Sequence, residues 1–294
     1  MKAAIAQIEV TDDLETNLSK ALVQIEQAAA LGADLILFGE LWNTPFIHEN
    51  IRAHAHDSKV ILPAFSRAAR ENGIWILAGT IPLFHEDKSR SGGEKSLYNT
   101  CLVFNDQGEI VAQADKLHLL EVHTRKNDYR ESEVFTPGDA LVRFASPWGN
   151  IAIAICFDVR FPEVCRLLCE DCFLLAVCAG FNVHAGKKHW APLIQTRAME
   201  NEVFVLAANP AHADYGSYQS YGHSMAVSPD GQILAALNGE EGLLLVDIDP
   251  DQVQKIRHRS PFWSLRRLDL YDLQAKGNVL QTIGFKSEKT PADH

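Results

Sequence analysis

Hydrophobic positions in the first part of the chain alternate between short continuous runs and stretches of helical spacing. Residues 2–10 and 33–40 are apolar runs of the length typical of buried strands. Between them, across residues 13–31, apolar side chains recur every three or four positions, which predicts an amphipathic helix. The chain is therefore predicted to open with a β-α-β unit.

The rest of the first half mixes this pattern with a hairpin. A helix is predicted at residues 62–71 and a strand at residues 74–83. Two further strands, residues 96–104 and 109–116, are joined by the turn sequence Asn-Asp-Gln-Gly at 105–108. We therefore expect a sheet that combines parallel crossovers with antiparallel pairs.

The second half repeats this order of elements. Its predicted strands are residues 151–156, 173–178, 203–209, 223–228, 232–237 and 242–248. Its predicted helices begin at Pro162, near Lys188 and at Asp251. No linker or low-complexity tract separates the two halves, which favours one α/β domain built as a two-sheet sandwich with helices outside.

Composition narrows the classes of partner. The chain has 294 residues, of which 47% are hydrophobic, but no apolar run of about 18 residues and no secretory signal at its start. Acidic residues outnumber basic ones 38 to 27, so the net field repels nucleic acid and anionic membranes. We expect a cytoplasmic protein without a nucleic-acid or membrane partner, in which an anionic small substrate would need its own cationic anchor.

Cysteine and histidine raise the question of a metal. Four thiols fall within fourteen positions, at Cys165, Cys169, Cys172 and Cys178. Their spacing does not repeat a C-x2-C pair, and the first two lie one helical turn apart on an apolar stripe. The twelve histidines also match no metal-ligand pattern. The sequence therefore predicts buried thiols, with no metal and no cofactor.

Three polar residues stand at the ends of predicted apolar strands, where open α/β sheets usually build their sites. They are Glu40, Lys116 and Cys156. Each alone has an ordinary explanation, as a surface glutamate, a solvated lysine and an inert thiol. Together they supply a base, a positive charge and a nucleophile, the set that covalent acyl chemistry needs.

The segments around these residues resemble a known family over nearly the whole chain. FGELW, DKLHLL and CFDVRFPE resemble the three signature segments of the nitrilase superfamily of carbon–nitrogen hydrolases, and further matches most resemble its ω-amidase branch. The resemblance implies a four-layer α-β-β-α sandwich over residues 1–270. It also implies a homodimer or higher homo-oligomer, with the tail at residues 271–294 at the interface.

The resemblance also implies catalytic roles. Glu40 would take the proton of the thiol, and Cys156 would attack the amide carbon. Lys116 would stabilise the oxyanion together with the backbone N–H of Phe157. Acylation would release ammonia, and a water molecule activated by Glu40 would hydrolyse the thioester.

A second family glutamate maps to Glu131, which would help to position the substrate and the lysine, with Glu133 as the nearby competitor. The chain also departs from the family pattern. Gly39 stands where proline usually precedes the glutamate, and Cys178 and Ala179 replace a Pro-Gly pair. These departures affect the expected substrate more than the reaction class.

The substrate implied by the ω-amidase resemblance is a short dicarboxylic monoamide, with 2-oxoglutaramate first and succinamate second. Arg160 is the candidate anchor for its carboxylate, but it could equally be a structural ion-pair partner. The expected pocket wall consists of Trp42, Phe46, Phe157, Phe181 and backbone N–H groups near Asn182.

Other functions of the same triad stay open at this point. An amidase of different substrate class, a carbamoyl-amine hydrolase, a nitrilase or an acyltransferase could use the same thiol. A non-catalytic binding protein is disfavoured because all three triad residues are present.

Overall fold

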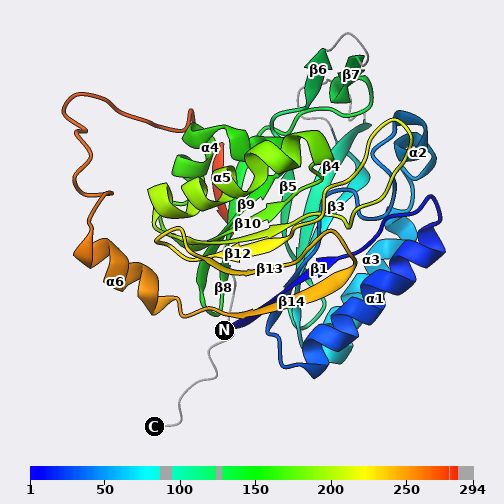
Figure 1. The fold of residues 1–294 in the computed structure, drawn as a ribbon, viewed down its shortest axis with the longest axis horizontal. Helices are drawn as coiled ribbons and strands as arrows, with labels where there is room; N and C mark the ends of the chain where they lie inside the picture. Colours follow the sequence, from blue (N-terminus) through cyan, green and yellow to red (C-terminus); the bar gives the residue numbers. More distant parts are fainter. Residues whose placement is uncertain (87–94, 124–127, 278, 284–294) are drawn as a thin grey trace.

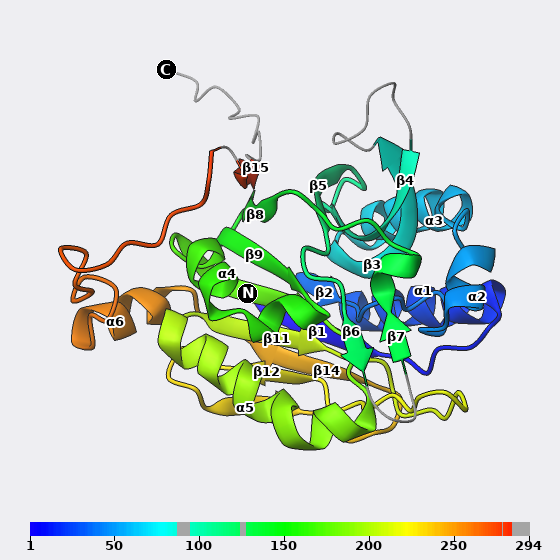
Figure 2. The same cartoon turned by 90° about the horizontal axis from the view of Figure 1, so that it is seen from above.

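The computed structural model describes residues 1–86, 95–123, 128–277 and 279–283. Two β-sheets pack face to face with helices on their outer faces, which confirms the predicted four-layer α-β-β-α sandwich (Figures 1 and 2). Helices α1 (Leu14–Ala30) and α3 (Ser58–Asn72) cover one sheet. Helices α4 (Pro162–Leu168) and α5 (Val183–Asn201) cover the other.

The first sheet has the strand order β14-β1-β2-β3-β4-β5. Its strands are β1 (Lys2–Gln7), β2 (Leu35–Leu37), β3 (Trp75–Glu86), β4 (Lys95–Phe104), β5 (Ile110–Asp115) and β14 (Gly242–Asp247). Strands β1, β2 and β3 run parallel, whereas β14 pairs antiparallel with β1. A strand from the second half of the chain therefore completes the sheet of the first half.

The second sheet has the order β13-β12-β11-β10-β9-β8-β15. Its strands are β8 (Leu141–Ser146), β9 (Gly149–Ile155), β10 (Cys172–Cys178), β11 (Phe204–Ala208), β12 (Met225–Val227), β13 (Ile233–Ala236) and β15 (Leu280–Ile283). Strands β9, β10 and β11 run parallel at its centre.

Successive residues of the central strands enter different cores. Ala3 and Ile5 of β1 join the core between the two sheets, whereas Ala4 and Ala6 pack under α1 and α3. Side chains alternate across a strand, so a strand buried on both faces needs apolar residues at every position. This requirement explains the continuous apolar runs from which the strands were predicted.

Some helix starts and several short elements differ from the sequence prediction. Helix α5 begins at Val183 rather than near Lys188, because the side chain of Asn182 accepts a 2.8 Å hydrogen bond from Ala185 N and caps the helix. The elements not predicted include β8, β15, α2 (His48–Ala53), β6 (Glu121–His123), β7 (Asp128–Arg130) and the 3₁₀ helices η1 (Glu131–Glu133) and η2 (Cys156–Arg160).

Helix α6 (Asp251–Arg259) is followed by an extended arm that runs along the outside of the molecule (Figure 1). Leu265 and Leu270 on this arm are 70% and 69% exposed. Strand β15, within the predicted tail at 271–294, adds to β8 of the same chain, and residues 284–294 lie outside the described part. The interface role of this tail stays a prediction.

No helix in the described ranges is both long and apolar enough to cross a membrane.

Candidate active site

Glu40 lies just beyond β2, at the carboxyl end of the parallel strands. Its backbone N–H donates a 3.0 Å hydrogen bond to the carbonyl of Ala179, which follows β10, so the two sheets are joined at this point. Gly79 on the neighbouring strand has a φ of 60°, and a Cβ there would lie 2.1 Å from the carbonyl oxygen of Gly39. Only glycine therefore fits at position 79, and the glutamate is held by close backbone packing.

This contact brings together Gly39 and Ala179, two residues that depart from the family pattern. A Cβ at Gly39 would lie 3.1 Å from the carbonyl oxygen of Ala179 and 3.3 Å from the carbonyl carbon of Asn209. The small residue at position 39 therefore allows the close approach of the loops that follow β2, β10 and β11.

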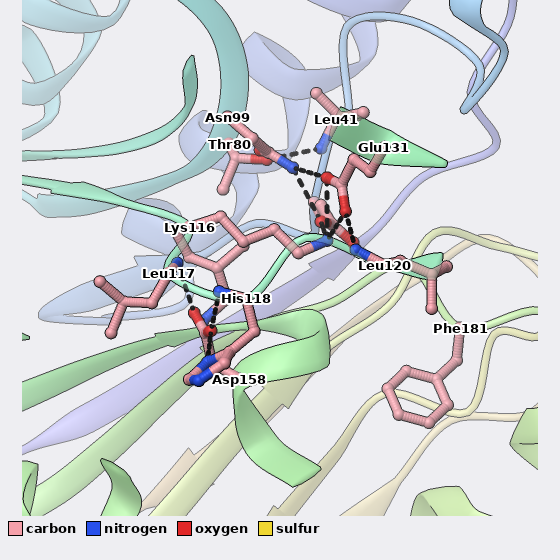
Figure 3. A network of polar contacts seen from close by, with 12 residues as sticks. Leu41, Thr80, Asn99, Lys116, Leu117, His118, Leu120, Glu131, Asp158 and Phe181 are labelled. Carbon is pink, nitrogen blue, oxygen red and sulfur yellow. Dashed lines mark hydrogen bonds and ion pairs between the residues drawn. The ribbon is translucent and has the colours of Figure 1, made fainter. Parts of the chain in front are cut away.

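Lys116 directly follows β5, and its backbone N–H donates a 2.9 Å hydrogen bond to the carbonyl of Asn99. Its Nζ lies 2.7 Å from Glu40 Oε1, 2.7 Å from Glu131 Oε2 and 3.0 Å from Glu131 Oε1. All three side chains are fully buried. One ammonium group thus contacts two carboxylates in the interior, and Figure 3 shows Lys116 next to Glu131.

Asn99 completes this cluster, and sequence reasoning missed it. Its Nδ2 donates hydrogen bonds of 2.8 Å to Glu40 Oε1 and 3.1 Å to Glu131 Oε1 (Figure 3). Asn99 is completely buried in the middle of β4. A buried amide needs polar partners. An asparagine inside an otherwise largely apolar strand was the signal that could have identified it.

The structure separates Glu131 from its competitor Glu133. Glu131 is buried in η1, contacts Lys116 and also accepts a 2.7 Å hydrogen bond from Leu120 N. The side chain of Glu133 is 59% exposed, and its carboxylate lies 3.6 Å from His48 Nδ1. Of the two glutamates, Glu131 is therefore the one that contacts the lysine.

Cys156 begins η2 immediately after β9, in a left-handed backbone conformation with a φ of 43°. This conformation costs a residue with a side chain about 1–3 kcal/mol and is frequent at functional sites. Glu40 Oε2 has no hydrogen-bond partner among the described residues, and it lies 3.0 Å from where a Cβ at Gly180 would be. The thiol of Cys156, Glu40 and Gly180 line one cavity.

Asp158 connects the turn that carries Cys156 to the segment that follows Lys116. Its carboxylate accepts hydrogen bonds of 2.8 Å from both the backbone N and the Nδ1 of His118 (Figure 3). It also accepts a 3.3 Å bond from Ile155 N, just before the thiol. Asp158 therefore sets the position of the nucleophile relative to the lysine.

Burial dominates the electrostatics of the site. Burial raises the pKa of Glu40. The charge of Lys116 opposes this increase, and the charge of Glu131 adds to it. Burial alone would lower the pKa of Lys116, but the charges of Glu131 and Glu40 outweigh the effect of burial. The pKa of Lys116 therefore lies well above its ordinary value. Burial and the charge of Glu40 raise the pKa of Cys156 well above normal. The resting thiol is therefore protonated and needs a base.

The cavity that contains the triad thiol has a volume of about 270 Å³. Ligand sites commonly span about 300–1,000 Å³, so this cavity suits a small molecule. Its wall consists of Glu40, Phe46, Ile47, His48, Glu49, Leu120, Val122, Tyr129, Glu133, Cys156, Gly180, Asn182, Ser217 and Tyr218. Phe46 and Asn182 lie in the wall, as predicted.

Trp42 does not lie in the cavity wall, so that part of the sequence prediction is wrong. Its ring stacks on Phe65, 4.9 Å between centroids, and its Nε1 donates a 2.6 Å hydrogen bond to the carbonyl of Ala78. The left-handed residue that follows Glu40, Leu41, turns the chain here. The tryptophan consequently packs in the core under α3.

The cavity wall also lacks Phe157, Arg160 and Phe181, which the sequence placed in the pocket. These three residues form a separate group. The guanidinium of Arg160 lies 5.8 Å from the ring centre of Phe157 and 5.1 Å from that of Phe181. It also lies 3.3 Å from His189 Nδ1. No carboxylate of the described chain lies within ion-pair distance of Arg160. A structural ion-pair role for this arginine is therefore not supported.

Sequence reasoning missed His48, Tyr129 and Tyr218 in the wall. They lie in α2, β7 and the loop before β12, segments that have no strong hydrophobic periodicity. Their side chains come together only through the fold.

The six cysteines are free and buried, and Cys101 Sγ lies 3.8 Å from Cys178 Sγ. The described ranges contain no group of three or more histidine, cysteine or acidic side chains placed to hold a metal.

Comparisons with known proteins agree with this geometry. A sequence model of the carbon-nitrogen hydrolase family matches residues 2–258. The chain is 33% identical over 284 residues to the omega-amidase NIT2 of Xenopus tropicalis, covering 94% of this chain and 99% of that one.

Two solved structures show the same fold. The NitFhit protein of C. elegans superposes with a TM-score of 0.84 at 30% identity, covering 92% of this chain and 66% of that one. A mutant amidase of Nesterenkonia sp. AN1, with acrylamide added at its active-site cysteine, superposes with a TM-score of 0.71 at 25% identity, covering 88% and 97%. The chain therefore belongs to the carbon–nitrogen hydrolases of the nitrilase superfamily, enzymes that hydrolyse carbon–nitrogen bonds.

Proposed function

We propose that the protein hydrolyses a small carboxamide through a thioester on Cys156. The observation that carries this proposal is the shared cavity of Cys156 and Glu40, with the ammonium of Lys116 held 2.7 Å from the same glutamate. The active-site cysteine named for the Nesterenkonia amidase supports it.

In the acylation step, Glu40 accepts the thiol proton and the sulfur attacks the amide carbon. Glu40 Oε2 is the oxygen available for this transfer, since Oε1 already accepts from Lys116 and Asn99. The C–N bond of the tetrahedral intermediate then breaks, and the proton held by Glu40 passes to the leaving nitrogen, which departs as ammonia.

Lys116 contributes a buried positive charge next to the developing oxyanion. Its ammonium group already faces one oxygen of Glu40 and both oxygens of Glu131. The N–H of Phe157, in the first turn of η2, is the direct donor that we assign to the oxyanion.

Deacylation reverses these roles. Glu40 takes a proton from a water molecule, the resulting hydroxide attacks the thioester, and the C–S bond breaks to give the carboxylic acid. The sulfur leaves as a thiolate and recovers the proton from Glu40.

For the substrate we propose a short dicarboxylic monoamide, 2-oxoglutaramate first and succinamate second. The small cavity and the omega-amidase name of the Xenopus relative support this choice. The remote carboxylate needs a hydrogen-bonding or cationic anchor, for which the sequence points to Arg160.

Ammonia release across a panel tests this function. The panel includes 2-oxoglutaramate, succinamate, glutamine, an N-carbamoyl amine and a short nitrile, each with and without an amine acceptor. We expect kcat/KM for 2-oxoglutaramate to exceed that for glutamine at least about tenfold. Preference for glutamine, the carbamoyl amine or the nitrile would change the substrate class, and amine-dependent product would indicate an acyltransferase.

A cytoplasmic location and a homodimer belong to the same proposal. Six free thiols are compatible with a reducing compartment. The exposed leucines of the arm after α6 provide an apolar surface for a second copy. Sedimentation velocity of the full chain and of a Leu265→Ser/Leu270→Ser variant tests the dimer, which we expect the variant to weaken.

A further inference from the structure

Two residues of the cavity wall each carry a buried hydrogen-bonding atom that the triad mechanism does not use. These atoms are His48 Nε2 and the hydroxyl of Tyr129. Both atoms are buried, and neither has a hydrogen-bond partner in the described part of the chain. Leaving such an atom unsatisfied costs about 1–3 kcal/mol, so a pair of them in a cavity wall indicates a ligand group that completes them.

The two side chains are held in place by packing. The rings of His48 and Tyr129 lie 4.6 Å apart, and the ring of Tyr129 also packs on Phe46 at 5.6 Å. The other ring nitrogen of the histidine, Nδ1, lies 3.6 Å from the carboxylate of Glu133. These contacts orient both polar atoms before any ligand binds, which reduces the entropic cost of binding.

The hydroxyl of Tyr129 acts as a donor, and Nε2 of His48 does so in the ring tautomer that carries its proton there. Burial raises the pKa of Tyr129, so its hydroxyl keeps its proton over the whole neutral range. The carboxylate of Glu133 lies 3.6 Å from Nδ1 of His48, beyond hydrogen-bond distance, so it does not hold the ring proton at that nitrogen. One O–H donor and one N–H donor in the same wall suit a carboxylate better than an amine or a methyl group.

We infer that His48 and Tyr129 form the specificity pair that binds the carboxylate at the end of the substrate remote from the scissile amide. This inference rests on the proposed amidase function and deepens it. It assigns the anchor to two residues of the cavity wall rather than to Arg160, which packs against Phe157 and Phe181 beside the cavity.

The same wall contains Glu49 and Glu133, whose charges would favour a substrate with a terminal ammonium group. An amine tail is therefore the competing ligand chemistry. Three amides of similar length distinguish the possibilities: succinamate ends in a carboxylate, butyramide in a methyl group and 3-aminopropanamide in an ammonium group.

The experiment measures kcat/KM for these three amides with the wild-type enzyme and with Tyr129→Phe and His48→Phe, which keep the aromatic packing. We expect the wild type to prefer succinamate to butyramide. Each variant should reduce the succinamate-to-butyramide ratio about tenfold, mainly through KM for succinamate. Tyr271→Phe, at an exposed tyrosine of the arm, is the matched control and should leave the ratio unchanged.

A ratio unaffected by both variants, or a wild-type preference for 3-aminopropanamide, would overturn the inference. A reduced ratio in Arg160→Met without any reduction in the two aromatic variants would move the anchor to the arginine. If the wild type releases no ammonia from any amide, the proposed function itself fails, so the two failures remain distinguishable.

Discussion

The carboxylate of Asp158 accepts a 2.8 Å hydrogen bond from the backbone N–H of His118, and this contact joins the two segments that carry the nucleophile and the lysine. Asp158 lies two residues after Cys156, and His118 two residues after Lys116. The segment with Cys156 and Asp158 follows β9 of the second sheet, whereas the segment with Lys116 and His118 follows β5 of the first sheet. The relative position of the catalytic groups thus depends on a bond between the sheets.

The first prediction concerns this bond. Asp158→Asn should reduce kcat about tenfold with little change in KM, because an amide cannot accept all the hydrogen bonds that the carboxylate receives from His118 and Ile155. Steady-state kinetics and thermal melting measure the effect, with the exposed Asp251→Asn as control. A rise in KM at constant kcat would assign Asp158 to substrate binding instead.

The second prediction tests the nucleophile. Cys156→Ala should abolish turnover and leave the melting temperature nearly unchanged, because the thiol borders the cavity and its removal costs little packing. Cys165→Ala, also buried but outside the cavity, is the matched control: it should keep its activity and lose about 0.5–3 kcal/mol of stability. More than about one hundredth of wild-type activity in Cys156→Ala would refute the covalent role.

The third prediction concerns the buried ammonium. Lys116→Met should reduce kcat about 10²–10³-fold and also destabilise the fold by about 3–5 kcal/mol, because Glu40 and Glu131 lose their counter-charge. The double variant Lys116→Met/Glu131→Gln should recover part of the lost stability but none of the lost activity. Denaturant titration and kinetics separate the two effects, with the exposed Lys59→Met as control. An unchanged kcat with a raised KM would remove Lys116 from oxyanion stabilisation.

The two glutamates of η1 provide a fourth prediction. Glu131→Gln should reduce kcat at least about tenfold, because it removes the charge that holds Lys116. Glu133→Gln should leave turnover of butyramide close to that of the wild type, because the side chain of Glu133 is 59% exposed and makes no ion pair with Lys116. Equal loss of kcat in both variants would contradict this division of roles.

The pH profile of kcat/KM provides the fifth prediction. Glu40 must be ionised to accept the thiol proton, and its pKa is raised above 4.5. Activity should therefore decline as the pH falls through this raised pKa, so the acid limb should lie above pH 4.5. The pKa of Lys116 lies well above 10.5, so the lysine should cause no loss of activity at neutral or mildly alkaline pH. An acid limb at or below the ordinary glutamate value would show that Glu40 does not act as the base.

The sequence alone determined the sandwich and the positions of Glu40, Lys116 and Cys156. Strands buried on both faces must be apolar at every position, so they are visible as continuous runs, and a polar group at the end of such a run stands out. Helix α5 shows the limit of this reasoning, because its start depends on the cap at Asn182 and not on periodicity.

Only the tertiary structure decided which other residues reach the site. Asn99, which the sequence did not indicate, meets Glu40 and Glu131 through contacts between segments distant in sequence. Trp42, adjacent to the triad segment in sequence, turns into the core instead. His48 and Tyr129 lie in short elements without periodicity and meet only in the folded chain. Local patterns record burial and backbone preference, whereas the wall of a cavity depends on long-range packing that a single sequence does not display.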